Sequence, residues 1–137
     1  MRPEAYALAA LAVGVIIAAF WTIGGPMTAQ AERRDTTRLS DLNALYLHMV
    51  CLRNTAGVAP EDLATARSDL CQNPRREDPY TGVPYHIEVT PAGAFRLCAK
   101  LETSAPPPRW MAGPHFDPET GCITRTPPDP PGPALHR

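Results

Sequence analysis

The chain opens on an unbroken apolar run and is polar afterwards. Residues 5–23 form nineteen consecutive positions without a charged side chain, and only Tyr6 and Thr22 carry a polar group. As a helix this run is ~28 Å long at about 1.5 Å per residue, close to the roughly 30 Å hydrocarbon core of a bilayer. The pattern predicts a transmembrane helix within a membrane anchor, residues 1–26, which ends in a Gly-Gly-Pro kink.

Residues 29–53 contain no glycine or proline and predict a long helix that continues beyond the kink as a spine. Apolar side chains recur there at helical spacing and form one stripe: Leu39, Leu42, Tyr46 and Met49, flanked by Leu45 and Leu52. We expect this stripe to pack inside the domain. A short second helix is predicted to begin at Pro60, with an inner face of Leu63, Ala66 and Leu70, and to end near Cys71 before Asn73-Pro74.

Further along, the pattern changes to a period of two. Apolar and polar side chains alternate over residues 85–90 and again over 95–101, with a Thr-Pro-Ala-Gly turn between them. Residues 122–125 predict a last strand after an Asp-Pro-Glu-Thr-Gly turn. We therefore expect an α+β fold in which a small antiparallel β-meander follows the helices. The soluble domain would span 27–125, and the proline-rich residues 126–137 would be a disordered tail.

The four cysteines favour two disulfides over a zinc site. Their number is even, no two are spaced as C-x-x-C, and they follow a hydrophobic segment typical of export. Ile123 can face the core only if Cys122 faces the other way, as Cys98 does on its own strand. A short helix folding back on the spine would bring Cys71 near Cys51. The predicted pairs are Cys51–Cys71 and Cys98–Cys122.

Charge and polar spacing give no sign of catalysis or of nucleic-acid binding. The formal net charge is −1, and the histidines, which we expect on the surface, have no partner three or four residues away: His48, His86, His115 and His136. The acidic turns at Asp78 and Asp117 offer oxygens to Ca²⁺, but Asp-Pro turns form for backbone reasons alone. Residues 75–78 are expected to be a solvated turn with compensating charges. We predict no catalytic residue, no metal and no cofactor, and we expect a protein that is not an enzyme.

The N-terminal segment allows two interpretations. Ala29-Gln30-Ala31 has the form of a signal-peptidase site, and cleavage there would release a soluble exported domain. The apolar run is longer than a secretory h-region and ends eight residues before Ala31, which favours an uncleaved anchor. Basic residues at 33, 34 and 38 would place the domain in the cytoplasm by the positive-inside rule, whereas the cysteines favour an oxidising compartment. We expect a single-pass inner-membrane protein whose C-terminal domain is periplasmic.

The order of elements and several motifs resemble known proteins. The layout is similar to the pilin-like architecture of the major pseudopilins of type II secretion. A group of uncharacterised single-span bacterial proteins is similar in more detail, on motifs that stand here at 24–26 (Gly-Gly-Pro), 33–42 (Arg-Arg-Asp-Thr-Thr-Arg-Leu-Ser-Asp-Leu), 78–85 (Asp-Pro-Tyr-Thr-Gly-Val-Pro-Tyr), 95–99 (Phe-Arg-Leu-Cys-Ala), Trp110, His115, Gly121 and Cys122. The resemblance covers residues 1–125 and implies a pilin-like fold. A prepilin-peptidase site does not precede Ala5, so we do not expect filament assembly.

These observations lead to an expected role and an alternative. We expect a non-enzymatic accessory or assembly component of a membrane complex, which acts by contact with the membrane and an integral membrane partner. Gly14 and Ala18 are small enough for another helix to approach the span, and Trp110 after the proline run is a candidate partner contact. The alternative is a cleaved, soluble exported domain that binds a small ligand or ion.

Overall fold

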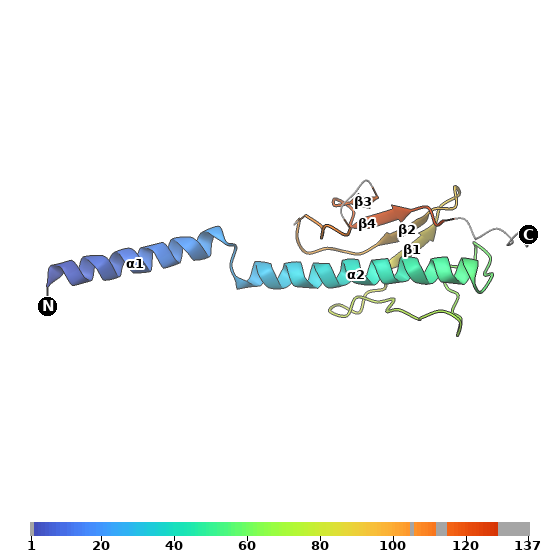
Figure 1. The fold of residues 1–137 in the computed structure, drawn as a ribbon, viewed down its shortest axis with the longest axis horizontal. Helices are drawn as coiled ribbons and strands as arrows, with labels where there is room; N and C mark the ends of the chain where they lie inside the picture. The colour runs from blue at the N-terminus through green and yellow to red at the C-terminus, as the bar shows by residue number, and fades with distance from the viewer. Residues whose placement is uncertain (1, 105, 112–114, 129–137) are drawn as a thin grey trace, which may run out of the picture.

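A computed structural model describes residues 2–104, 106–111 and 115–128 of the chain. Two helices come first, α1 (Pro3–Thr22) and α2 (Pro26–Asn54). Four strands follow: β1 (His86–Val89), β2 (Phe95–Cys98), β3 (Phe116–Asp117) and β4 (Cys122–Arg125). The expected α+β class is confirmed, with an elongated helical part that leads into a small sheet (Figure 1). Of the expected tail, residues 129–137 lie outside the described part of the chain.

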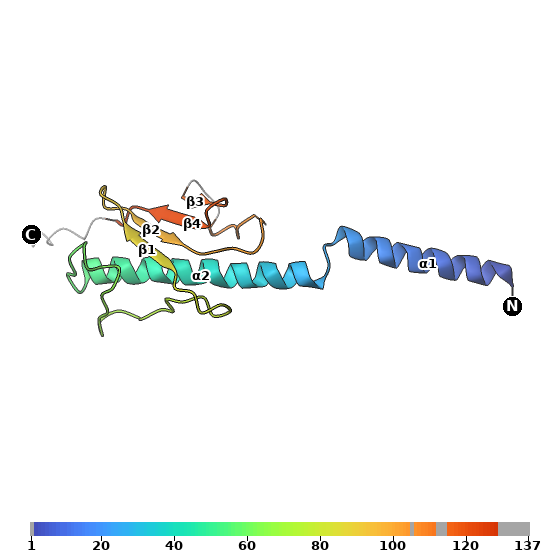
Figure 2. The same ribbon diagram turned by 180° about the vertical axis from the view of Figure 1, so that it is seen from behind.

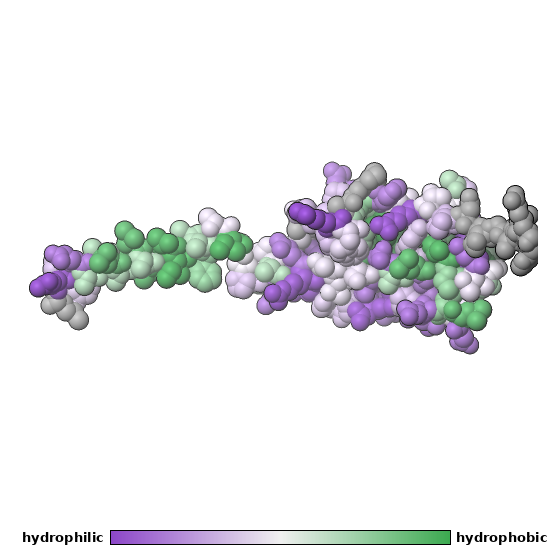
Figure 3. Space-filling view, in the orientation of Figure 1, coloured by the Kyte–Doolittle hydropathy of each residue, from purple (hydrophilic) through white to green (hydrophobic). Residues whose placement is uncertain are grey.

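α1 stands apart from the rest of the protein. All of its residues are exposed, and Figure 3 shows it as an almost wholly hydrophobic rod. It is long and apolar enough to cross a membrane, judged by length and composition. The helix ends at Thr22, and Gly24 takes a positive φ of 66° before Pro26 begins α2, so the predicted break is confirmed. Only glycine adopts that conformation without cost.

α2 is the spine on which the domain is built. The stripe predicted from helical spacing lies in the core, where Leu39, Leu42, Leu45, Met49 and Leu52 are buried. The half-buried Tyr46 meets the ring of Phe95 edge-on at 6.1 Å between centroids. The sheet lies on one side of α2, and the segment between α2 and β1 passes along the other (Figures 1 and 2). The first residues of α2, at positions 26–33, have almost no cover.

The sheet is antiparallel, but it is not a simple meander. Its strand order is β1-β2-β4-β3. β3 precedes β4 in the sequence but lies at the edge of the sheet, and the turn at residues 117–121 brings the chain back so that β4 pairs between β2 and β3. The predicted parity is confirmed, since Phe95, Leu97 and Ile123 are buried while Arg96 and Thr124 are exposed. The two-residue β3 was not predicted, because a pair of residues is too short to show alternation.

Two disulfides close the domain, and they join the predicted pairs. Cys51 at the end of α2 is bonded to Cys71, and Cys98 on β2 is bonded to Cys122 on β4. Cys98 and Cys122 are direct partners in the register, 4.0 Å apart at Cα, as suits a non-hydrogen-bonded antiparallel pair. All four cysteines of the sequence are thereby paired.

The predicted short helix after Pro60 is wrong. The chain makes isolated turns there, such as the bond from Ala66 N to Asp62 O, and Leu70 is 70% exposed instead of facing inward. The reason is a competing donor. The guanidinium of Arg76 bonds the carbonyls of Ala64 and Ala66, which a helix would pair with backbone N–H groups four residues later. Leu63 nevertheless reaches the core as predicted.

Gly121 is predicted to tolerate no side chain. It has a φ of 67°, and a Cβ built there would lie 2.2 Å from the carbonyl oxygen of Ala99. Gly121→Ala should therefore destabilise the protein by roughly 3 kcal/mol, combining backbone strain with overpacking. Thermal unfolding of the full chain in mild detergent measures the loss.

Gly93→Ala is the matched control. Gly93 also has a positive φ, 81°, but nothing lies within 4 Å of a Cβ placed there, so only the strain of about 1 kcal/mol should remain. Equal losses in the two variants would contradict the close approach of Gly121 to Ala99.

Candidate functional site

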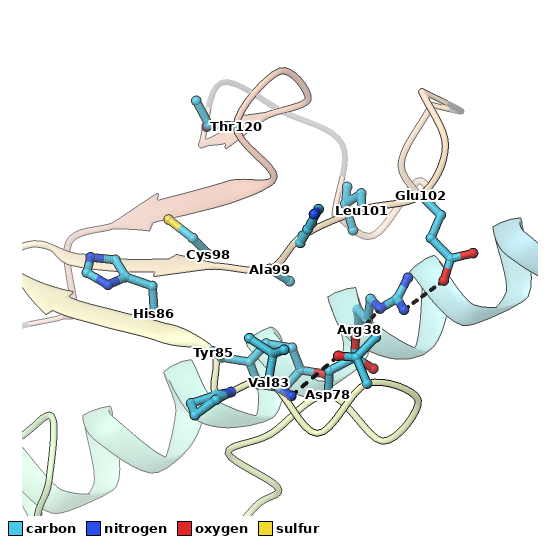
Figure 4. Close-up of a pocket in the computed structure, with 13 residues that line it drawn as sticks. Arg38, Asp78, Val83, Tyr85, His86, Cys98, Ala99, Leu101, Glu102 and Thr120 are labelled. Atoms are coloured by element: carbon cyan, nitrogen blue, oxygen red, sulfur yellow. Dashed lines mark hydrogen bonds and ion pairs between the residues drawn. The ribbon is translucent and has the colours of Figure 1, made fainter.

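Arg38 is the centre of a buried ion cluster. It lies on α2 directly before Leu39, the first residue of the apolar stripe, and its side chain is 1% exposed. Each guanidinium nitrogen bonds a different carboxylate: Nη1 to Asp35 at 2.8 Å, Nε to Asp78 at 2.7 Å and Nη2 to Glu102 at 2.8 Å. The cluster therefore joins the spine to the turn before β1 and to the segment after β2 (Figure 4).

Asp35 fastens the segment after β2 to the helix. Its carboxylate accepts the backbone N–H of Glu102 at 2.9 Å and the N–H and hydroxyl of Thr103, both at 2.8 Å. Arg34 adds an outer contact, because its Nε donates to Glu102 at 3.0 Å. A charge buried with this many partners is stable only while all of them remain in place.

Asp78 organises the turn predicted from the Asp-Pro-x-Thr-Gly motif. Its carboxylate accepts the N–H of Tyr80 at 2.9 Å, and its own N–H donates to the carbonyl of Val83 at 2.9 Å. The ring of Tyr80 lies 5.5 Å from the guanidinium carbon of Arg38, within the range of a cation–π contact. The turn is thus held against the cluster on two sides.

The protonation states of the cluster follow from these contacts. Hydrogen bonds from Arg34 and then Arg38 lower the pKa of Glu102 to about 2. Burial alone would raise the pKa of Asp78, but the Tyr80 N–H and the Arg38 guanidinium outweigh it and lower that pKa. Burial likewise opposes the charge of Arg38, yet the three carboxylates raise its pKa. Each of these three pKa shifts favours the charged form of its group near neutral pH.

A groove of about 650 Å³ opens beside this cluster. Its lining comes from the turn before β1, from the end of β2 and from the cluster itself: Arg38, Asp78, Thr81, Val83, Pro84, Tyr85, His86, Cys98, Ala99, Lys100, Leu101, Glu102 and Thr120. Most of the surface it offers is apolar, with the ions at one end (Figure 4). Its volume falls within the ~300–1,000 Å³ typical of binding sites.

Pro84 explains why the groove exists. β1 and β2 pair through His86 and Cys98, and the same register would place Pro84 opposite Lys100. Proline has no N–H to give to that pair, so the ladder ends there and the two segments separate. Tyr85 is held on its own side, since its N–H bonds the carbonyl of Arg76 and its hydroxyl donates to Asp41 at 2.8 Å.

A second polar cluster corrects two predictions. His48, expected on the surface, is 3% exposed, and its Nε2 lies 3.3 Å from Nη2 of Arg76. Residues 75–78, expected to be a solvated turn, supply both the half-buried Arg76 and the buried Asp78. Burial, with the nearby charges of Arg76 and Arg67, lowers the pKa of His48. The neutral His48 ring does not repel the Arg76 guanidinium, which donates hydrogen bonds to the carbonyls of Ala64 and Ala66.

The contact residues proposed from sequence lie elsewhere. Gly14 and Ala18 are exposed on α1, and nothing lies within 4 Å of a Cβ built at Gly14. Trp110 is 51% exposed in the loop after the proline run, while its neighbour Met111 is buried. Of the predicted disulfide and contact residues, which all lie in the described part of the chain, Cys98 alone lines the groove. The acidic side chain of Asp117 accepts bonds from Glu119 N–H and the Thr120 hydroxyl within its own turn.

The ion cluster itself was missed. A signal was present, because Asp35 and Arg38 continue the spacing of the apolar stripe toward the N-terminus of α2. Charged residues at core-facing positions are informative, since they are almost never fully buried without partners.

We compared the chain with protein-family models, with curated proteins and with solved structures, and none of the three comparisons gave a match.

Replacing Arg38 should cost far more than replacing its neighbour. Arg38→Met leaves the carboxylates of Asp35 and Asp78 buried without their cation, which should lower the free energy of unfolding by about 3–5 kcal/mol. Arg34→Met removes only the outer contact to Glu102 and should cost at most about 1 kcal/mol. Denaturant unfolding of the full chain in detergent compares them; similar costs would show that the cluster is not a unit.

Acid should weaken the fold in two steps. The unfolded chain protonates His48 below its ordinary pKa of 6.5, whereas the folded chain resists, so stability should fall as the pH drops below about 6.5. The stability from Glu102 is present above its ordinary 4.5 and should be lost as the pH falls toward about 2.

Thermal unfolding from pH 7.5 to pH 3 tests both steps. His48→Gln keeps an acceptor for Arg76 without the titration, and should flatten the first step while it leaves the second unchanged. A variant profile parallel to the wild type throughout would exclude His48 as the source of the first step.

Proposed function

We propose that this protein is a membrane-anchored, non-enzymatic accessory or assembly component that acts by protein contact on the periplasmic side of the inner membrane. The observation that carries the proposal is the contrast between the two helices. α1 exposes all of its apolar residues, while α2 buries its stripe within the domain. A helix with that surface is stable in lipid or against another helix, and unfavourable in water.

Two features support the compartment and the family. The disulfides fit an oxidising environment outside the cytoplasm. Arg34 and Arg38 count against a periplasmic domain under the positive-inside rule, but both form ion pairs within the folded domain. The long spine beneath a small antiparallel sheet is consistent with a pilin-like layout.

The alternative, a cleaved and soluble ligand-binding domain, is favoured by one specific observation. Cleavage after Ala31 would remove α1 and the uncovered start of α2, and the first buried residue, Asp35, lies beyond that point. The domain would keep its core and its groove. The N-terminal sequence of the mature protein decides: a chain that begins at Glu32 and stays soluble supports the alternative, whereas an intact anchor in carbonate-washed membranes supports our proposal.

Enlarging the small face of α1 should weaken a membrane complex. Gly14→Leu combined with Ala18→Leu should reduce co-purification of the partner from mild detergent, because bulky side chains keep helices apart. Trp110→Ala should also reduce it if the exposed loop contacts the partner. Thermal unfolding of the domain should not change, since α1 makes no buried contact with it.

Ala19→Leu is the matched control, because Ala19 lies roughly 120° around α1 from the midpoint of Gly14 and Ala18. Equal effects at both faces would indicate general disturbance of the span, and a native protein that migrates as a lone monomer would oppose the proposal.

A further inference from the structure

We infer that the groove beside the ion cluster binds an extended, mainly apolar peptide segment that carries one acidic side chain. This inference rests on the proposed function, and it names the chemistry of the partner segment. Three observations carry it: an interrupted strand ladder, apolar walls and a lysine in the groove that has no ion pair among the described residues.

The first observation is a backbone edge that faces the groove. Ala99 donates its N–H to the carbonyl of Gly121 on the β4 side, so the groups of the next residue, Lys100, face the opposite way, toward Pro84. Within the described residues, the backbone of Lys100 has no protein hydrogen bond. An extended peptide placed there would supply the donor and acceptor that Pro84 does not, as in β-strand addition.

The second observation is the nature of the walls. Val83 is 60% exposed on one wall, and Ala99 and Leu101 stand on the other. The volume of about 650 Å³ has room for a short run of side chains and not for a folded domain. Because alternate side chains of a strand face the same way, a segment with apolar residues at every second position fits such walls.

The third observation is charge. Asp78 and Glu102, the acids of the groove, are paired with Arg38 and do not select a basic ligand. Lys100 lines the same groove, and within the part of the chain that the structure describes its side chain has no ion pair or hydrogen bond. An acidic side chain on the bound segment would complement that charge, which favours one peptide over another more than it adds affinity.

Peptide titration of the isotope-labelled full chain in nanodiscs tests the inference. The probes are an eight-residue peptide of alternating valine and threonine with one aspartate, and the same peptide with lysine in that place. We expect the acidic peptide to shift the amide resonances of Val83 and Lys100, and to bind roughly fivefold more tightly than the basic one, the scale of an exposed ion pair. Lys100→Glu should reverse that preference.

Matched variants test where the peptide binds. Val83→Arg should abolish binding, whereas Leu47→Arg, at a 58% exposed position on α2 away from the groove, should not. Equal binding of the two peptides, unchanged by Lys100→Glu, would overturn the charge argument. Shifts that avoid Val83 and Lys100 would overturn the site. If neither peptide binds while the α1 variants still disrupt the membrane complex, this inference fails and the proposed function stands.

Discussion

The fold depends on one guanidinium group placed where the hydrophobic core would otherwise continue. Arg38 binds carboxylates from three segments of the chain: its own helix α2, the turn before β1 and the segment after β2. The core beyond it is small, and apolar burial alone constrains neither the approach of the turn before β1 nor that of the segment after β2. A buried charge needs all its partners in place, so it imposes an orientation on them that non-directional apolar contact does not.

The elements with regular periodicity were predictable from sequence. The span, the break at Gly24 and Pro26, the stripe from Leu39 to Leu52 and the strand parity depend on local patterns that repeat every two or 3.6 residues. The disulfide pairs follow from that parity and from the return of the chain past α2. These features need little knowledge of which distant segments meet.

The predictions that failed concern features that depend on contacts between distant segments of the chain. The segment after Pro60 has the composition of a helix, but Arg76, ten residues beyond Ala66, takes its carbonyls. His48 was expected on the surface because it has no partner three or four residues away, yet the same segment covers it. The groove arises where Pro84 meets the position opposite Lys100, which is visible only once the register is known. In the first two cases a polar contact between distant residues prevailed over the local pattern, and in the third a hydrogen bond between distant residues could not form.

If α1 spans a membrane, as proposed, the uncovered start of α2 determines how far from the bilayer the domain can act. Between Pro26 and Arg38 the helix rises about 18 Å at 1.5 Å per residue, and almost nothing packs on its first two turns. With α1 in the membrane, this stretch is a helical spacer between the bilayer and the domain. Gly24 and Gly25 at its N-terminal end are the hinge about which it can tilt. A protein confined to the lipid would touch only α1. Anything that reaches the groove must itself extend well clear of the headgroups, so height above the membrane becomes a means of selecting partners.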